Sequence, residues 1–290
     1  MKPSDTAELL LLAALWGGSF LFMRIAAPVL GPVWLIEIRV LLAGLVLLPV
    51  LIKSGLLGQM RRHLRSLFIV GCINSAIPFA LLAFASVSLP AGFTSILNST
   101  APLFGTVVAA VWLKERLTLT RMLGFVLGFV GVTILVGWKT VDATAGFGLA
   151  VLAGLSGGLM YAIAAPYIKQ TLNNVPALVV ATGSQLGAAV FLLPALPFTV
   201  PSQMPSSGVI VSVLALAIIS TAFAYILYFR LIQNIGSTKA LTVTYLVPLF
   251  ALLWGAIVLQ ETVTLPMLIG CGLVLLGTAI ANDLLAFKGR

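Results

Sequence analysis

Residues 101–132 read APLFGTVVAAVWLKERLTLTRMLGFVLGFVGV, and residues 247–278 read VPLFALLWGAIVLQETVTLPMLIGCGLVLLGT. The second stretch repeats the pattern of the first at an offset of 146 residues. The residues that match at this offset are Pro102 and Pro248, Glu115 and Glu261, Thr118 and Thr264, Gly124 and Gly270, and Gly131 and Gly277. This doubled pattern predicts that the chain consists of two copies of one repeat unit.

The composition around this repeat is that of a membrane protein. Of the 290 residues, 61% are hydrophobic and only 8% are charged, and the mean hydropathy is +1.18. A helix needs about 20 mostly apolar residues to cross the hydrocarbon layer. The sequence offers ten such windows, at residues 7–29, 32–53, 66–86, 90–113, 120–138, 146–168, 176–198, 208–230, 238–259 and 265–286. We therefore expect an all-α polytopic membrane protein with ten transmembrane helices.

Each copy of the repeat contains five of the predicted spans. A first unit over residues 1–140 and a second over residues 146–290 together form a single membrane domain, 1–290. Because five is odd, the second unit must enter the membrane from the side opposite to the first, which predicts two inverted five-helix repeats. In folds of this kind the repeats surround a central cavity, and the substrate binds near the midplane, where they meet.

The positive charges lie almost all on one side of the predicted membrane. The formal net charge is +9, yet only Lys139 falls in a loop on one side, while Arg24 and Arg39 lie inside spans. The loops on the other side hold Lys2, Lys53, Arg61, Arg62, Arg65, Lys114, Arg116, Arg121, Lys169, Arg230, Lys239, Lys288 and Arg290. By the positive-inside rule both termini are cytoplasmic. This distribution indicates membrane orientation and no nucleic-acid partner.

The sequence lacks the residues that an enzyme would need. Cys72 and Cys271 lie in separate apolar spans, and the one histidine, His63, lies in a basic loop. Without clustered histidines, thiols or carboxylates we expect no metal, no cofactor and no catalytic site. The loops are too short for an ATPase domain, and the glycine loop that cradles a phosphate is missing.

Four stretches resemble the drug/metabolite transporter superfamily in its ten-span EamA branch. They are LWGGSF at residues 15–20, IRVLLAGLVLL at 38–48, and the doubled APLFGTVVAAVWLKERLT at 101–118 and VPLFALLWGAIVLQETVT at 247–264. The resemblance implies a ten-helix basket whose central cavity is walled by the third, fourth, eighth and ninth helices. The first and sixth helices would contribute to that wall, and the fifth and tenth would pack outside. The chain also resembles bacterial exporters of amino acids, including aromatic amino acid exporters.

Polar residues beside prolines are candidate substrate contacts. Thr94, Asn98 and Pro102 recur at helical spacing in the fourth span, and Thr244 and Pro248 take the matching positions of the ninth. A proline frees the carbonyl four residues earlier, and a freed group is tolerated only against protein or a water-lined cavity. Asn74 and Pro78 repeat this pairing in the third span, and the 146-residue offset places Ser220 and Thr221 of the eighth span on Asn74 and Ser75, which makes them further candidates. The alternative is that these small polar residues only hold helices together.

Three aromatic residues complete the predicted substrate site. Phe79, Tyr161 and Tyr225 fall at a similar depth in spans that the resemblance places around the cavity. Binding pockets are mostly apolar with a few placed polar groups, so these rings suit an apolar or aromatic substrate. Packing between helices or contact with lipid is the alternative for each ring.

Glu37 is the one acidic residue clearly inside a span, and it shares the outer third of the first two spans with Arg24 and Arg39. A charge inside a membrane is costly and usually functional. We expect Glu37 to compensate the two arginines or to form an outer gate with them. A proton-coupling role for Glu37 is the alternative.

These features predict a carrier of the bacterial cytoplasmic (inner) membrane that exports small metabolites by alternating access. The absence of a midplane carboxylate favours a zwitterion or a neutral metabolite over a lipophilic cation, and amino acids with aromatic or large apolar side chains are the first candidates. The alternatives are a broad drug/metabolite efflux carrier and, in a different class, a non-transporting membrane sensor or assembly subunit. The expected partners are a small-molecule substrate and the lipid bilayer, and the sequence is compatible with a monomer.

Overall fold

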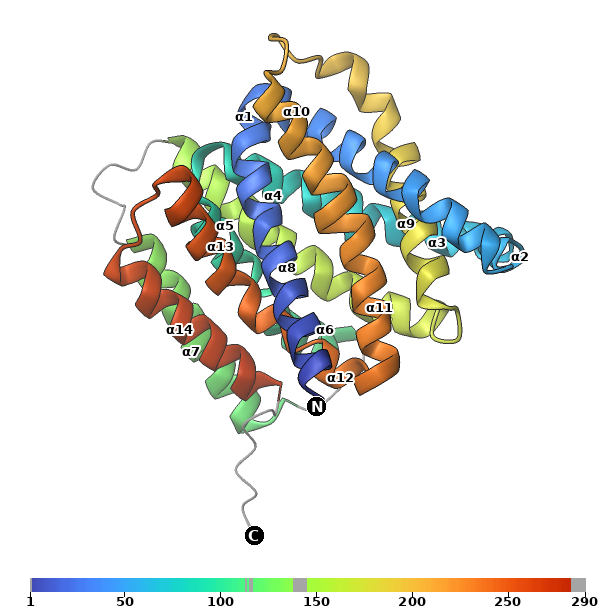
Figure 1. Ribbon diagram of the computed structural model, residues 1–290. Coiled ribbons are helices and arrows are strands. Elements are labelled where there is room, and N and C mark those ends of the chain that lie inside the picture. The colour runs from blue at the N-terminus through green and yellow to red at the C-terminus, as the bar shows by residue number, and fades with distance from the viewer. Residues whose placement is uncertain (1, 113, 115–116, 138–144, 283–290) are drawn as a thin grey trace.

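The computed structural model describes residues 2–112, 114, 117–137 and 145–282. Within these residues the regular structure is helical (Figure 1), and seven helices or runs of joined helices are long and apolar enough to cross a membrane. Two shorter apolar helices, α13 (Val243–Leu259) and α14 (Leu265–Ala281), complete the set. The prediction of an all-α polytopic membrane protein is therefore confirmed.

The first long helix holds two of the predicted spans. Helix α1 (Pro3–Lys53) has 51 residues and a non-helical residue inside it, Gly31, with φ 73° and ψ 157°. A positive φ is readily adopted only by glycine, and Pro32 follows directly. The chain therefore turns at Gly31, between the predicted windows 7–29 and 32–53.

The other predicted windows also coincide with helical segments. The third window holds α3 (Leu64–Gly71), η1 (Cys72–Ala76) and α4 (Ile77–Ser88), and the fourth holds α5 (Ala91–Asn98) and α6 (Ala101–Trp112). Next come α7 (Leu119–Gly137), α8 (Ala145–Thr171), and α9 (Ala177–Leu192) with η3 (Leu193–Phe198). The eighth window holds α10 (Ser207–Leu214), η4 (Ala215–Phe223) and α11 (Ala224–Ile235). Two short helices, α2 (Leu57–Arg62) and α12 (Ser237–Ala240), lie between spans.

Helices α7 and α14 pack closely on each other along one side of the molecule (Figure 1). A Cβ atom added at Gly124 would lie 2.5 Å from the backbone nitrogen of Ala281, and one at Gly131 would lie 2.9 Å from the carbonyl oxygen of Gly270. Small residues let two helix backbones approach each other in a membrane. Because a higher number on α7 meets a lower number on α14, the two helices are antiparallel.

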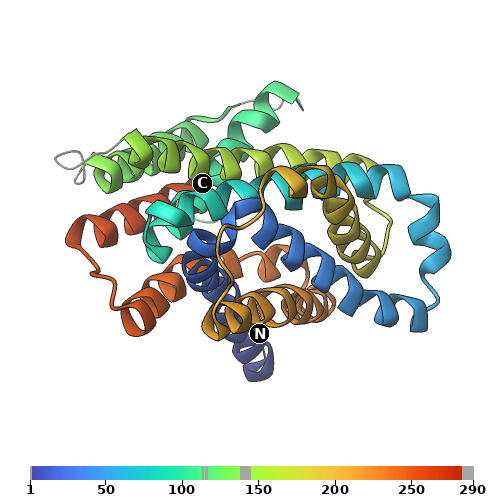
Figure 2. The same ribbon diagram turned by 90° about the horizontal axis from the view of Figure 1, so that it is seen from above.

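Helix α1 lies at the centre of the bundle. It contacts α4 and α9 as well as α10, α11 and α13, and Figure 2 shows it between α8 on one side and the α10–α11 segment on the other. The largest buried cluster joins side chains of α1, α4, α9, α10 and α13. Large apolar side chains such as Leu45, Val126 and Leu268 are exposed on the outside, as expected for a surface that faces lipid.

Candidate functional site

Two spans contain π-helical turns at positions that match in the predicted repeat. Segment η1 covers residues 72–76, and a shift of 146 residues brings it to 218–222, inside η4. Pro78 follows the first turn and has no N–H to donate to the carbonyl of Asn74. Single π turns inside α-helices are frequent at functional sites. Asn74, Ser220 and Thr221, which we predicted as substrate contacts, lie in these two turns.

The η4 turn positions Thr221 as an acceptor for Arg39. The Thr221 hydroxyl donates to the carbonyl of Leu216, five residues earlier, at 2.7 Å, and Arg39 Nε donates to Thr221 Oγ1 at 3.0 Å. Thr221 is the middle residue of the 29-residue run Ser207–Ile235, about 21 Å of helix from either end. The Arg39 guanidinium therefore lies near the middle of that span, although Arg39 is close to the start of its own predicted window, 32–53.

An aromatic ring lies against this guanidinium, with two tyrosines nearby. The Arg39 Cζ atom lies 3.7 Å from the centroid of the Phe79 ring, a cation–π contact. The Tyr161 ring meets Phe79 edge-on at 6.4 Å between centroids, and Tyr161 and Tyr225 both lie within electrostatic range of Arg39. We call Arg39, Phe79, Tyr161, Thr221 and Tyr225 the central cluster. It brings together predicted residues from α1, α4, α8, η4 and α11.

The polar residues of the fourth and ninth spans lie in different surroundings. Helix α5 ends at Asn98 and α6 begins at Ala101, so the fourth span is broken just before Pro102. Within the described ranges, the buried Asn98 Oδ1 has no hydrogen-bond partner. In contrast, Thr244 is exposed and donates to the carbonyl of Leu241 at 2.8 Å, while Pro248 lies inside the continuous helix α13. Asn98 and Thr244, which match in the predicted repeat, therefore differ in how deeply they are buried.

The remaining predicted substrate residues are mostly inside the bundle. Thr94 is fully buried, and its hydroxyl donates to the carbonyl of Pro90 at 3.2 Å. Pro78, Phe79, Ser220, Thr221 and Pro248 are buried, and Asn74, Asn98, Pro102, Tyr161 and Tyr225 are half-buried. Ser220 Oγ has no hydrogen-bond partner in the described part of the chain.

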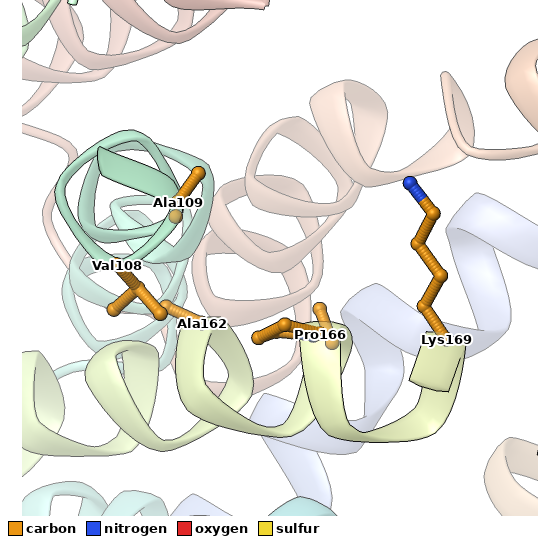
Figure 3. Close-up of a pocket in the computed structure, with 7 residues that line it drawn as sticks. Val108, Ala109, Ala162, Pro166 and Lys169 are labelled. Carbon is orange, nitrogen blue, oxygen red and sulfur yellow. The ribbon is translucent and has the colours of Figure 1, made fainter. Parts of the chain in front are cut away.

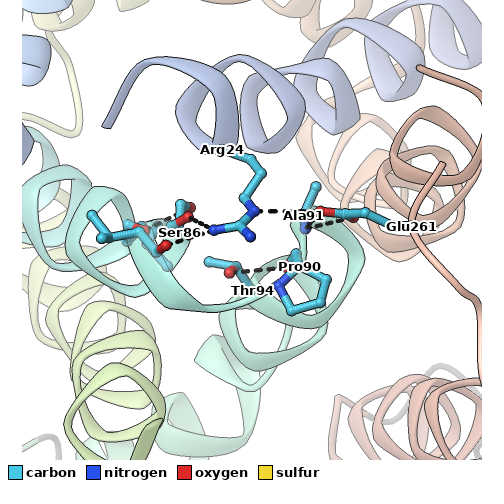
Figure 4. Close-up of polar contacts among 8 residues, drawn as sticks. Arg24, Ser86, Pro90, Ala91, Thr94 and Glu261 are labelled. Carbon is cyan, nitrogen blue, oxygen red and sulfur yellow. Dashed lines mark hydrogen bonds and ion pairs between the residues drawn. The ribbon is translucent and has the colours of Figure 1, made fainter. Parts of the chain in front are cut away.

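Arg24 belongs to a second polar cluster, which sequence analysis did not anticipate (Figure 4). Its NH1 donates to the carbonyls of Ser86 and Val87 at 3.0 and 2.6 Å, and its Nε lies 3.5 Å from Glu261 Oε1. Glu261 Oε2 also accepts from the N–H of Ala91, the first residue of α5, at 3.0 Å. A carboxylate is favoured at a helix N-terminus, where N–H groups lack partners. We call Arg24, Ser86, Val87, Ala91 and Glu261 the Arg24 cluster. It joins α1, the end of α4, the start of α5 and the loop after α13.

A glycine allows Glu261 to fold back onto α5. The Glu261 N–H donates to the Gly255 carbonyl at 3.1 Å, and a Cβ atom on Gly255 would collide with the Glu261 carboxylate. Gln260, just before Glu261, has a positive φ of 54°, so the chain reverses at the end of α13. The doubled Glu-x-x-Thr motif marked Glu261 in the sequence, but its partners are too distant along the chain to be read from it.

Glu37 does not compensate Arg24 and Arg39 directly, which differs from the expectation. It is 3% exposed, and neither of its carboxylate oxygens has a hydrogen-bond partner among the residues that the structure describes. Within the described residues Arg24 pairs with Glu261, and Arg39 contacts Thr221, Phe79 and the sulfur of Met23. Residues two positions apart on a helix face nearly opposite directions, so Glu37 and Arg39 point to different neighbours.

An apolar hollow of ≈ 200 Å³ lies between α6 and α8 (Figure 3). It is lined by Gly105, Val108, Ala109, Ala162, Ala165, Pro166 and Lys169. The Lys169 ammonium stands at one end of this hollow, near the C-terminus of α8. None of the predicted substrate residues lines it. A second hollow, beside the Arg24 cluster, is lined by Arg24, Pro28, Val87, Leu259 and Glu261.

Comparison with known proteins relates the whole chain to transporters. The profile of the EamA-like transporter family matches residues 7–137 and again residues 148–282. An uncharacterized transporter of Archaeoglobus fulgidus is 25% identical, over 94% of this chain and 96% of its own. A probable terminal-alkyne amino-acid exporter of Streptantibioticus cattleyicolor is 26% identical, over 97% and 95%. One solved crystal structure matches 100% of both chains with a TM-score of 0.69 at 18% identity, a likeness of fold alone.

Proposed function

Because the chain belongs to the EamA-like transporter family, we propose that it exports small metabolites by alternating access, with aromatic or large apolar amino acids as its substrates. That the protein is a membrane carrier follows from its family and from its transmembrane helices. It is a non-enzymatic protein. The substrate class and the mechanism are the parts that we propose.

The central cluster is the observation that carries the substrate class. Phe79, Tyr161 and Tyr225 supply aromatic surface, and Arg39 and Thr221 supply polar groups at the same depth. A small number of polar groups within an apolar wall is typical of ligand sites. The similarity to a probable amino-acid exporter supports the same class.

An inverted repeat underlies the proposed mechanism. At the 146-residue offset Gly124 matches Gly270 and Gly131 matches Gly277. In the packing, Gly124 meets Gly277 and Gly131 meets Gly270, which is the self-complementary pattern that a two-fold relation produces. The family profile also matches each half separately. These observations support two units, 1–140 and 146–290, that rock against each other.

Polar contacts at both ends of the bundle cross between these units. At the outer end Arg24 contacts Glu261, and at the other end Arg230 NH2 lies 3.0 Å from Glu8 Oε1. Glu8 and Arg24 are 16 residues apart on α1, about 24 Å along a helix. With the N-terminus in the cytoplasm of a bacterial cell and the protein in its inner membrane, Arg24 and Glu261 form the outer gate.

Counterflow of radiolabelled phenylalanine into proteoliposomes tests this function. We expect saturable flux. Tyr161→Ala should raise the KM roughly tenfold, because it removes apolar contact area with the substrate. Leu152→Ala, on the exposed side of the same helix, should leave the KM unchanged. Absence of saturable flux for every amino acid tested, with folded protein in the vesicles, would contradict the proposal and favour a sensor or assembly subunit.

A further inference from the structure

The charge of Arg39 is buried without an opposite charge beside it. Its side chain is 5% exposed, and within the described residues no carboxylate pairs with it. Burying an ionised group without a counter-charge is expensive, and buried charges in membrane helices usually mark a functional site. The Phe79 face offsets part of this cost through its cation–π contact, an interaction that leaves the net charge in place.

Hydrogen bonds also leave part of the guanidinium free. An arginine side chain has five N–H donors. In the structure Nε donates to Thr221 Oγ1 and NH1 to the Met23 sulfur at 3.9 Å. A thioether is a weak acceptor, so Arg39 retains donors suited to a planar anion. Arginine binds carboxylates through two parallel hydrogen bonds.

The surroundings of Arg39 fix its orientation before a ligand arrives. The hydroxyl of Thr221 is oriented by its own hydrogen bond to the Leu216 carbonyl, and the Phe79 ring lies against the Arg39 Cζ atom. The Tyr161 ring lies edge-on to Phe79, so aromatic surface is next to the charge. A molecule with a carboxylate near an aromatic or large apolar group matches this arrangement.

We propose that Arg39 binds the carboxylate of the transported substrate, and that Phe79 and Tyr161 contact its apolar part. This inference rests on the proposed function, since it concerns the substrate of the same carrier. It makes Arg39 the residue that determines specificity for carboxylated over decarboxylated compounds. The substrate class is thus an organic acid with an aromatic or bulky apolar group, of which amino acids are the zwitterionic members.

A ligand series on the wild-type protein tests, without any mutation, whether Arg39 binds the substrate carboxylate. Phenylalanine, 3-phenylpropionate, phenethylamine and phenylalanine methyl ester are each used to compete with radiolabelled phenylalanine in counterflow. Phenylalanine and 3-phenylpropionate should compete, whereas the amine and the ester should be roughly 10- to 100-fold weaker, because a charged hydrogen-bonded pair is lost. Equal competition by phenethylamine and phenylalanine would contradict carboxylate binding by Arg39, while the proposed carrier function would still hold. Absence of phenylalanine flux would instead contradict the proposed function.

Substitutions then assign the selectivity to Arg39. In Arg39→Met, the preference for phenylalanine over phenethylamine should fall to about one, and Arg39→Lys should keep part of it. Arg65→Met, which removes an exposed charge outside the cluster, should retain the full preference. A preference that persists unchanged in Arg39→Met would overturn the proposal, because a purely structural role would alter yield and not selectivity. If Arg39→Met does not fold, Thr221→Val serves instead, because it removes one hydrogen-bond partner of Arg39. This variant should weaken competition by phenylalanine more than competition by phenethylamine.

Discussion

The guanidinium of Arg24 is held against the carboxylate of Glu261, with Nε 3.5 Å from Oε1. The two residues belong to opposite halves of the chain, and Glu261 also caps the first turn of α5 through Ala91. Under the proposed alternating access, opening of the outer end must separate these groups. The side chains of Arg24 and Glu261 are 31% and 15% exposed, so solvent screens the ion pair, and the cap contributes much of the stabilisation.

We therefore expect Glu261→Gln to favour the outward-open state. The lost charge contacts correspond to about 1 to 2 kcal/mol, which is roughly a 5- to 30-fold shift in population. The measurement is labelling of Leu259→Cys by an impermeant thiol reagent, in a background without Cys72 and Cys271. Glu8→Gln, which weakens the opposite end, should slow this labelling. Unchanged labelling in Glu261→Gln would show that the pair does not gate the outer side.

The orientation of the chain gives a second prediction. Thirteen basic residues fall on the proposed inner side and one loop lysine on the outer side. Reporter fusions at Arg62, at Lys114 and at the C-terminus should all report the cytoplasm. A periplasmic signal from the C-terminal fusion would contradict a chain of ten spans with both ends inside.

The polar residues before the two prolines give a third prediction. Thr244 is exposed, whereas Asn98 is half-buried with its Oδ1 atom enclosed. Cys at either position should react with an impermeant reagent, with Thr244→Cys the faster, and substrate should slow both reactions. If both remain inert while reagents dissolved in lipid react, these residues face lipid and the cavity assignment fails.

Glu37→Gln distinguishes structural from coupling roles of the buried acid. Because the Glu37 oxygens have no hydrogen-bond partner, the substitution breaks no ion pair, and we expect near-normal expression. If Glu37 were instead one member of a buried ion pair, its removal would destabilise the fold by about 3 to 5 kcal/mol. We expect transport without an imposed pH gradient in both the wild type and the variant. A strict gradient requirement that Glu37→Gln abolishes at normal expression would identify Glu37 as the proton carrier.

Local sequence patterns predicted the spans but not the contacts between them. The apolar windows, the Gly31–Pro32 turn and the break before Pro102 all depend on neighbouring residues, so they can be read from the sequence. Arg39 and Thr221 are 182 residues apart along the chain, and helical spacing shows only that each faces inward. The η4 turn contains no proline, so no residue within it predicts a π turn. Glu37 was assigned to the arginines by proximity in sequence, whereas helix geometry turns it away from Arg39.

The close packing of α7 and α14 gives the last prediction. Alanine at Gly124 would place its Cβ atom 2.5 Å from the backbone nitrogen of Ala281, and a backbone cannot yield as a flexible side chain can. The helices must separate, which typically costs about 1 to 3 kcal/mol. Gly272→Ala is the matched control, because nothing lies within 4 Å of its added Cβ, and alanine favours a helix over glycine by up to about 1 kcal/mol. Thermal unfolding in detergent should show Gly124→Ala melting below the wild type and Gly272→Ala at or slightly above it. Equal melting temperatures for the two variants would mean that α7 and α14 do not pack through these glycines.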